Sequence, residues 1–143
     1  LLGIAADHQA EADDAALAAA AAAGDRILLT RDLDLLKRSV VRRGYRVRTT
    51  DPFDQAVEVL CRFDLAGHLA PFTRCLPCGA RLEEATAEEA AGRVPARVAA
   101  RHTDYRRCPA CDRLYWAGSH HRRLAALVDR IRQAADDPQQ SPA

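Results

Sequence analysis

With 143 residues, 48% of them hydrophobic, the chain can form one domain or two small ones with a buried core. It lacks a run of about 18 apolar residues, and its alanine-rich start has no basic flank, so membrane insertion and secretion are unsupported and a cytoplasmic location is expected. The net charge of +1 hides two basic segments: residues 26–48 hold eight basic residues against two acidic ones, and residues 93–132 hold ten against three. Either could face a polyanion, although a high-GC coding bias would also enrich arginine.

The first predicted elements are a helix and a strand. Because the chain has no methionine and opens with "LLGIAADH", which reads like a helix end and an extended segment, we expect it to begin inside a domain. The alanine run of residues 11–23 favours a helix, with Asp13 or Asp14 near its first turn and Gly24 after it. Residues 27–30, "ILLT", form a short apolar run that predicts a buried parallel strand.

Helices and strands continue to alternate after this strand. Residues 33–43 carry leucines and valines at helical spacing before Gly44, and residues 45–49 predict a second strand. Asp51 followed by proline is typical of a helix start, with the aspartate at the N-cap. The order helix, strand, helix, strand, helix predicts an α/β layer with parallel strands over residues 1–64.

The next unit, residues 65–134, contains two C-x-x-C motifs separated by 29 residues. A two-residue gap lets both thiolates of one turn reach the same ion at ~2.3 Å, so the pair predicts a structural four-cysteine zinc site. The predicted ligands are Cys75, Cys78, Cys108 and Cys111. Redox motifs or disulfides are the alternative, which the absence of a thioredoxin-like βαβ pattern disfavours. Cys61 is expected to be a packed thiol.

A basic amphipathic helix over about residues 119–134 and a disordered tail over residues 135–143 end the chain. Since four cysteines fill the coordination of a zinc ion, we expect His120 and His121 to have a surface or helix-capping role rather than a metal-binding one. Tyr115 and Trp116 could stack on bases, but covering the zinc knuckles is the favoured interpretation.

The acidic residues of the first part allow two interpretations. Asp32 follows a predicted strand, at the carboxyl edge where α/β proteins bind ligands, and Asp13 can reach the same edge. Such carboxylates could hold Mg2+ or Mn2+, which would activate water against a phosphodiester. Helix capping, worth ~1 kcal/mol per residue, is the alternative. The two roles are compatible because a capping aspartate keeps one oxygen free.

These motifs together resemble a known family. The segment "DDAALAAAAAAGDRILLTRDLDLLKR" is similar to the acidic-start helix, strand and following helix of PIN-like ribonucleases. "RCLPCGARL" and "RRCPACDRLYWAGSHHRRL" are similar to the zinc-ribbon extension of the Mut-seven C-terminal RNase domain family, so the resemblance covers about residues 1–130. It implies a PIN-like α/β sandwich, metal-dependent RNA cleavage and a C-terminal zinc ribbon. It also implies that the family's first strand, with a metal-site aspartate, and most of its first helix precede Leu1.

The resemblance assigns the catalytic role to Asp13, Asp14, Asp32 and Asp34, and it matches the four cysteines to the zinc ligands. The leading hypothesis is a ribonuclease that uses Mg2+ or Mn2+. Contacts with RNA are predicted for Arg31, Arg38, Arg42, Arg43, Arg106, Arg107, Trp116, His120, Arg122 and Arg123. The alternative is a catalytically inactive module that binds structured RNA or the ribosome, and a protein-interaction ribbon without an RNA partner is a weaker third hypothesis.

Overall fold

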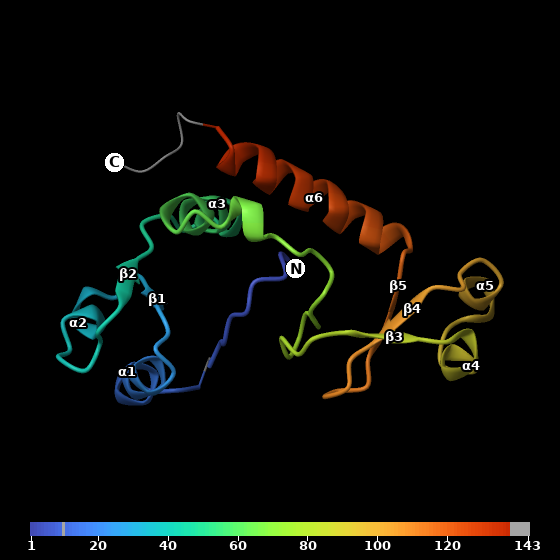
Figure 1. Cartoon of the computed structure of the whole chain (residues 1–143), viewed down its shortest axis with the longest axis horizontal. Coiled ribbons are helices and arrows are strands. Elements are labelled where there is room, and N and C mark those ends of the chain that lie inside the picture. Colours follow the sequence, from blue (N-terminus) through green and yellow to red (C-terminus); the bar gives the residue numbers. More distant parts are fainter. Residues whose placement is uncertain (10, 138–143) are drawn as a thin grey trace.

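The computed structural model describes residues 1–9 and 11–137, in which a long last helix connects an α/β part with a cysteine-rich part (Figure 1). The predicted mixed α/β fold is therefore confirmed. None of the helices in this part of the chain combines the length and the apolar character of a membrane span. Of the predicted tail, residues 138–143 lie outside the described residues, and Ala135 still belongs to the last helix.

The α/β part alternates helices with short strands. Its elements are α1 (Asp14–Ala23), β1 (Leu28–Thr30), α2 (Leu33–Leu36), β2 (Gly44–Arg46) and α3 (Pro52–Arg62). The strands β1 and β2 run parallel, with Leu28 opposite Gly44 and Thr30 opposite Arg46. This parallel pair with its flanking helices confirms the predicted α/β layer, but β1 is not buried as predicted, since Leu29 is 44% exposed.

The helix between the two strands is shorter than its sequence pattern predicts. The spacing of leucines and valines predicted a helix over residues 33–43, but α2 ends at Leu36. A helix over the whole predicted range would rise about 16 Å. β2 begins beside the start of β1, so the chain between the two strands must run back along the length of β1. For a strand as short as β1, this length is only about 10 Å. The prediction was wrong because strand pairing limits the length of the crossover.

The cysteine-rich part is built on an antiparallel sheet. Its elements are η1 (Ala66–His68), β3 (Glu83–Ala85), α4 (Ala87–Ala90), α5 (Ala96–Ala99), β4 (Tyr105–Arg107) and β5 (Leu114–Trp116). The strand order is β3-β4-β5, and Tyr105 lies opposite Ala85 on one side and Trp116 on the other. Because side chains alternate across a sheet, one face packs against the segment that carries α4 and α5, and the other faces two buried cysteines.

The last helix, α6 (Ser119–Ala135), lies along α3 (Figure 1). Ile131 of α6 forms a buried hydrophobic cluster with Val57 and Leu60 of α3. α6 follows β5 after a two-residue link, so this helix joins the sheet of the cysteine-rich part to the α/β part.

The N-terminal segment makes a second connection between the two parts (Figure 1). Leu2 packs against the α3–α6 cluster, and its carbonyl accepts a hydrogen bond from the Ala70 N–H at 3.1 Å. Gly3 has a φ of +83°, and a Cβ at this position would lie 1.8 Å from the Ala70 carbonyl oxygen. The Gly3 carbonyl also accepts a hydrogen bond from Nε of Arg74 at 3.1 Å. Only glycine fits this close approach of two backbones.

Candidate metal centre and carboxylate edge

The four predicted zinc ligands converge in the structure. The Sγ atoms of Cys75, Cys78, Cys108 and Cys111 all lie within 4.8 Å of one another. The Sγ atoms lie 3.5 Å apart in the pair Cys75 and Cys111, 3.4 Å apart in Cys78 and Cys108, and 3.8 Å apart in Cys78 and Cys111. Two segments that are far apart in the sequence therefore build one cluster of thiols.

The spacing of the sulfur atoms fits a tetrahedral metal site. Four thiolates at ~2.3 Å from a zinc ion lie about 3.8 Å apart, close to the separations found here, whereas a disulfide would bring two sulfur atoms to ~2.05 Å. All four cysteines are free thiols. The donor set and its spacing therefore fit a structural zinc ion, with no position left for a substrate.

Both knuckles use the same backbone geometry. The N–H of Gly79 donates to the Cys75 carbonyl at 2.9 Å, and the N–H of Asp112 donates to the Cys108 carbonyl at 2.8 Å. Gly79 and Asp112 are both left-handed, with φ of +72° and +58°. Aspartate tolerates this conformation better than most residues with a side chain, which is consistent with its use where the first knuckle has glycine.

The cluster has a buried and an exposed half. Cys75 and Cys108 are almost completely buried, whereas Cys78 and Cys111 are exposed. The hydroxyl of Tyr115, from β5, lies 3.0 Å from Sγ of Cys75. Burial would raise the pKa of the Cys75 thiol, but hydrogen bonds from Tyr115 and the neighbouring cysteines outweigh it and lower this pKa to about 6. The pKa values of Cys78 and Cys111 are raised instead, so these hydrogen bonds favour the thiolate at Cys75 over the other two positions.

The predicted catalytic aspartates lie at helix starts. Oδ1 of Asp13 accepts a hydrogen bond from the Ala16 N–H at 2.7 Å at the start of α1. Oδ1 of Asp32 accepts the N–H of Asp34 at 2.7 Å at the start of α2, which follows β1 directly. Asp51 caps α3 in the same way after β2. The capping roles of Asp13, Asp32 and Asp51 are confirmed.

These aspartates do not form a compact cluster like that of the cysteines. Among the described residues, the four cysteines are the group of three or more candidate ligands whose donor atoms approach one another within 4.8 Å. Asp14 pairs with Arg38 at 3.9 Å, and Asp34 pairs with Lys37 at 2.8 Å. The cap contacts of Asp32 engage Oδ1, so its Oδ2 has no hydrogen bond within the described residues. Metal binding by the aspartates stays a prediction.

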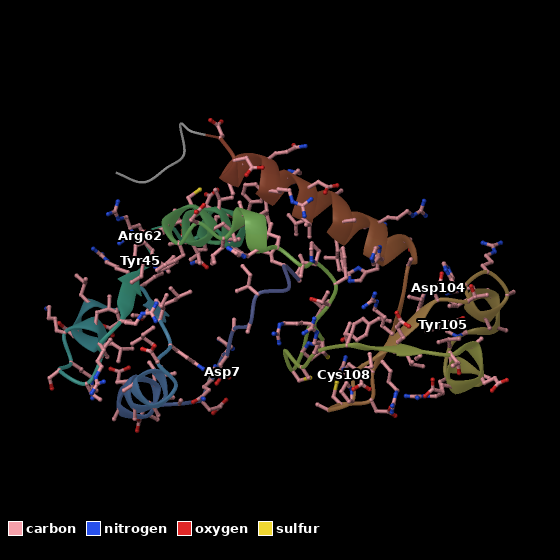
Figure 2. The ribbon with its side chains drawn as sticks, viewed as in Figure 1. Asp7, Tyr45, Arg62, Asp104, Tyr105 and Cys108 are labelled. Carbon is pink, nitrogen blue, oxygen red and sulfur yellow. The ribbon has the colours of Figure 1, made fainter. Side chains whose placement is uncertain are left out.

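A buried glutamate, not singled out from the sequence, organises the end of β2. Glu58 of α3 is 9% exposed and accepts hydrogen bonds from the Tyr45 hydroxyl, the Arg48 N–H, and both the N–H and the hydroxyl of Thr49. Tyr45 also lies beside Arg62, whose guanidinium is 5.6 Å from the tyrosine ring centroid (Figure 2). In the sequence, helical spacing places Glu58 beside the apolar positions of the predicted helix, and this pattern could have indicated that its carboxylate is buried.

The predicted RNA-binding arginines divide into two groups. Three of them form ion pairs with aspartates: Arg38 with Asp14, Arg43 with Asp25 at 3.4 Å, and Arg107 with Asp112 at 3.5 Å. The others are exposed and make no ion pair within the described residues; they are Arg31, Arg42, Arg106, Arg122 and Arg123. This second group is the set of charges that a polyanion could neutralise.

The aromatic residues near the ribbon have separate positions. Trp116 is half-buried against the cluster that contains Ala85 and Tyr105, on the sheet face opposite the cysteines. Tyr115 covers the knuckles instead. His120 is exposed in the first turn of α6, and the helix has no side-chain N-cap. In Figure 2, Tyr105 marks the first residue of β4, and Cys108 is the residue that follows this strand.

The model of one protein family, the Mut7-C RNAse domain, matches residues 1–128. The match spans both the parallel strands and the four cysteines, so it confirms the resemblance found from the sequence motifs. Neither the curated proteins nor the solved structures contain a significant match to the chain.

Proposed function

The chain belongs to the Mut7-C RNase domain family, and we propose that it cleaves RNA phosphodiesters with the help of a divalent cation at the carboxyl edge of the β1–β2 sheet. The family indicates a ribonuclease-like role. The observation that carries the proposal is the position of Asp32 directly after β1, where it caps α2 with one oxygen and keeps the other free of hydrogen bonds within the described residues. Ligand sites of α/β proteins occupy this edge.

Mg2+ or Mn2+ suits these carboxylates. Mg2+ retains several water molecules and binds through one or two carboxylates, so its ligands need not converge as closely as the four cysteines. Asp32 and Asp13 would hold the ion, Asp34 would assist, and Asp14 would stand beside Asp13. Asp51 is added as a candidate because it caps the helix after β2 as Asp32 caps the helix after β1. When bound, the ion would polarise the phosphodiester and activate water.

The exposed arginines without ion pairs would bind the RNA backbone. Arg31 and Arg42 belong to the α/β part, and Arg106, Arg122 and Arg123 belong to the ribbon and the start of α6. Contacts of this kind are sequence-independent and release counterions, so the affinity should fall steeply as salt increases. We therefore propose RNA as the substrate, with the zinc ribbon as part of its binding surface.

The test is an RNA cleavage assay with the zinc-loaded chain. Mg2+ or Mn2+ is omitted or added at constant zinc, because a chelator would remove zinc as well. Asp32→Asn is the informative variant, since asparagine caps a helix as well as aspartate does but carries no charge. We expect at least about 10-fold slower cleavage with an intact fold. Asp129→Asn, the same change at an exposed site of α6, should cleave normally.

The second candidate function is a catalytically inactive module that binds structured RNA or the ribosome. It is favoured by the absence of a compact three-carboxylate cluster among the described residues. Its signature is RNA binding with steep salt dependence, no cleavage in either metal, and equal affinity for wild type and Asp32→Asn. Cleavage that requires the added metal and slows in Asp32→Asn would exclude it.

A further inference from the structure

The hydroxyl of Tyr115 contacts the cysteine cluster from outside it. It lies 3.0 Å from Sγ of Cys75, within hydrogen-bond distance for a sulfur atom. Tyr115 is the middle residue of β5, and its neighbours Leu114 and Trp116 pack against the cluster of Ala85 and Tyr105 on the other face. Strand alternation therefore fixes the direction of the Tyr115 ring toward the knuckles.

The direction of this hydrogen bond follows from the chemistry of a zinc site. A cysteine that binds zinc is a thiolate and has no proton to donate. The Tyr115 hydroxyl must then be the donor and Sγ of Cys75 the acceptor. Four thiolates around one divalent ion carry excess negative charge, and Cys75, at 2% exposure, has little access to water that could stabilise it. Cys78 and Cys111 are exposed and can be solvated directly.

We propose that Tyr115 is a positioning residue for the zinc ion, which it retains by donating a hydrogen bond to the buried thiolate of Cys75. Groups that hydrogen-bond to metal ligands orient them, and their loss weakens metal binding by about 10- to 100-fold. Tyr115 therefore controls how tightly and how long the ribbon holds zinc. This role concerns the metal alone and is independent of whether the chain cleaves RNA.

The chain offers a matched control on the neighbouring strand. Tyr105 of β4 is buried, whereas Tyr115 is half-buried, and the Tyr105 hydroxyl donates a hydrogen bond to the carbonyl of His102 at 2.7 Å. That hydroxyl does not contact the cysteines. Tyr115→Phe and Tyr105→Phe thus remove the same atom from neighbouring strands of the same sheet, but only Tyr115→Phe changes the environment of a metal ligand.

The experiment measures zinc retention by the full chain. Each variant is loaded with zinc, its fold is checked by circular dichroism at saturating zinc, and the rate and equilibrium of zinc transfer to a coloured chelator are recorded. We expect Tyr115→Phe to hold zinc about 10- to 100-fold more weakly and Tyr105→Phe to match wild type. In the Co2+-substituted chain, the thiolate-to-metal charge-transfer band should shift in Tyr115→Phe alone.

Three results would overturn the proposal. The first is wild-type zinc affinity and an unshifted charge-transfer band in Tyr115→Phe. The second is an equal loss of zinc from both variants, because a general weakening of the sheet would then be the cause. The third is a Tyr115→Phe chain that stays unfolded at saturating zinc while Tyr105→Phe folds, since the hydroxyl would then act on folding and not on ion retention.

Discussion

Replacement of Glu58 by glutamine tests whether one buried carboxylate holds the end of β2 against α3. The two oxygens of Glu58 accept hydrogen bonds from the Tyr45 hydroxyl at 2.9 Å, the Arg48 N–H at 2.9 Å, the Thr49 N–H at 3.2 Å and the Thr49 hydroxyl at 3.0 Å. Glutamine has the same shape, but it replaces one accepting oxygen with an NH2 group and removes the charge. At least one of the donors then faces another donor.

The expected loss follows from this mismatch. A buried donor that is left without an acceptor lowers the free energy of unfolding by about 1–3 kcal/mol, and hydrogen bonds to a charged group are stronger than neutral ones. Hydroxyls can rotate to find another acceptor, but the N–H groups of Arg48 and Thr49 are fixed. We therefore expect Glu58→Gln to lower the free energy of unfolding by about 2 kcal/mol. With a urea m-value of about 2 kcal/mol/M, the midpoint should fall by about 1 M.

The assay is urea unfolding at pH 7 and constant free zinc, followed by circular dichroism. Asp129→Asn makes the same chemical change at an exposed site whose partner Arg132 lies 4.0 Å away, and it should stay within about 0.5 kcal/mol of wild type. A Glu58→Gln chain that unfolds at the wild-type midpoint would refute the reasoning, because the carboxylate would then contribute no more than an amide.

The effect should also depend on pH. Burial raises the pKa of Glu58, but the hydrogen bonds from Arg48, Thr49 and Tyr45 outweigh it, so the pKa lies below its usual 4.5. A lowered folded-state pKa means that the unfolded chain binds more protons, so this stabilisation is complete above pH 4.5 and is lost as the pH falls through the folded pKa. The difference between wild type and Glu58→Gln should therefore shrink in acid, and zinc loss affects both proteins alike.

Two further predictions concern backbone conformation. Gly3→Ala should lower the free energy of unfolding by about 2 kcal/mol or more, because the new Cβ would clash with the Ala70 carbonyl and the residue has a positive φ. The control is Gly67→Ala, where no atom lies within 4 Å of the added carbon, and it should leave the midpoint of the same urea titration unchanged. At Asp112, with φ of +58°, substitution by glycine should be less destabilising than substitution by alanine by about 1 kcal/mol, because both remove the ion pairs with Arg93 and Arg107 but only alanine has a Cβ. Equal midpoints for the two variants would contradict this account of the second knuckle.

The predictions made from the sequence were most accurate where a short local pattern allows only one structure. Asp51 followed by proline fixed the start of α3, and the structure shows Asp51 at the N-cap with Pro52 in the first turn. The C-x-x-C spacing predicted one site for four cysteines, and their Sγ atoms converge. The cap and each single knuckle depend on a few consecutive residues, and the convergence of the two knuckles was predictable because a structural zinc ion requires four ligands.

Features that depend on distant residues could not be read from the sequence. The length of α2 is set by the short pairing of β1 with β2, and the role of Gly3 depends on its contact with Ala70. Tyr115 and Trp116 were both expected to cover the knuckles, but strand alternation gives that position to Tyr115 alone and directs Trp116 to the other face. A shift of one residue in a strand exchanges the two faces, so the register of β4 and β5 decides which aromatic ring meets the metal site.

The same register connects the metal site with the rest of the molecule. β5 carries Tyr115 against Cys75 and leads through a two-residue link into α6, whose Ile131 is buried against α3. A zinc ion that fixes the knuckles would therefore also fix the position from which α6 extends. Since α3 holds the loop after β2 through Glu58, a series of contacts runs from the ribbon to the carboxyl edge of the parallel sheet. The ribbon is thus part of the framework that supports the candidate catalytic edge.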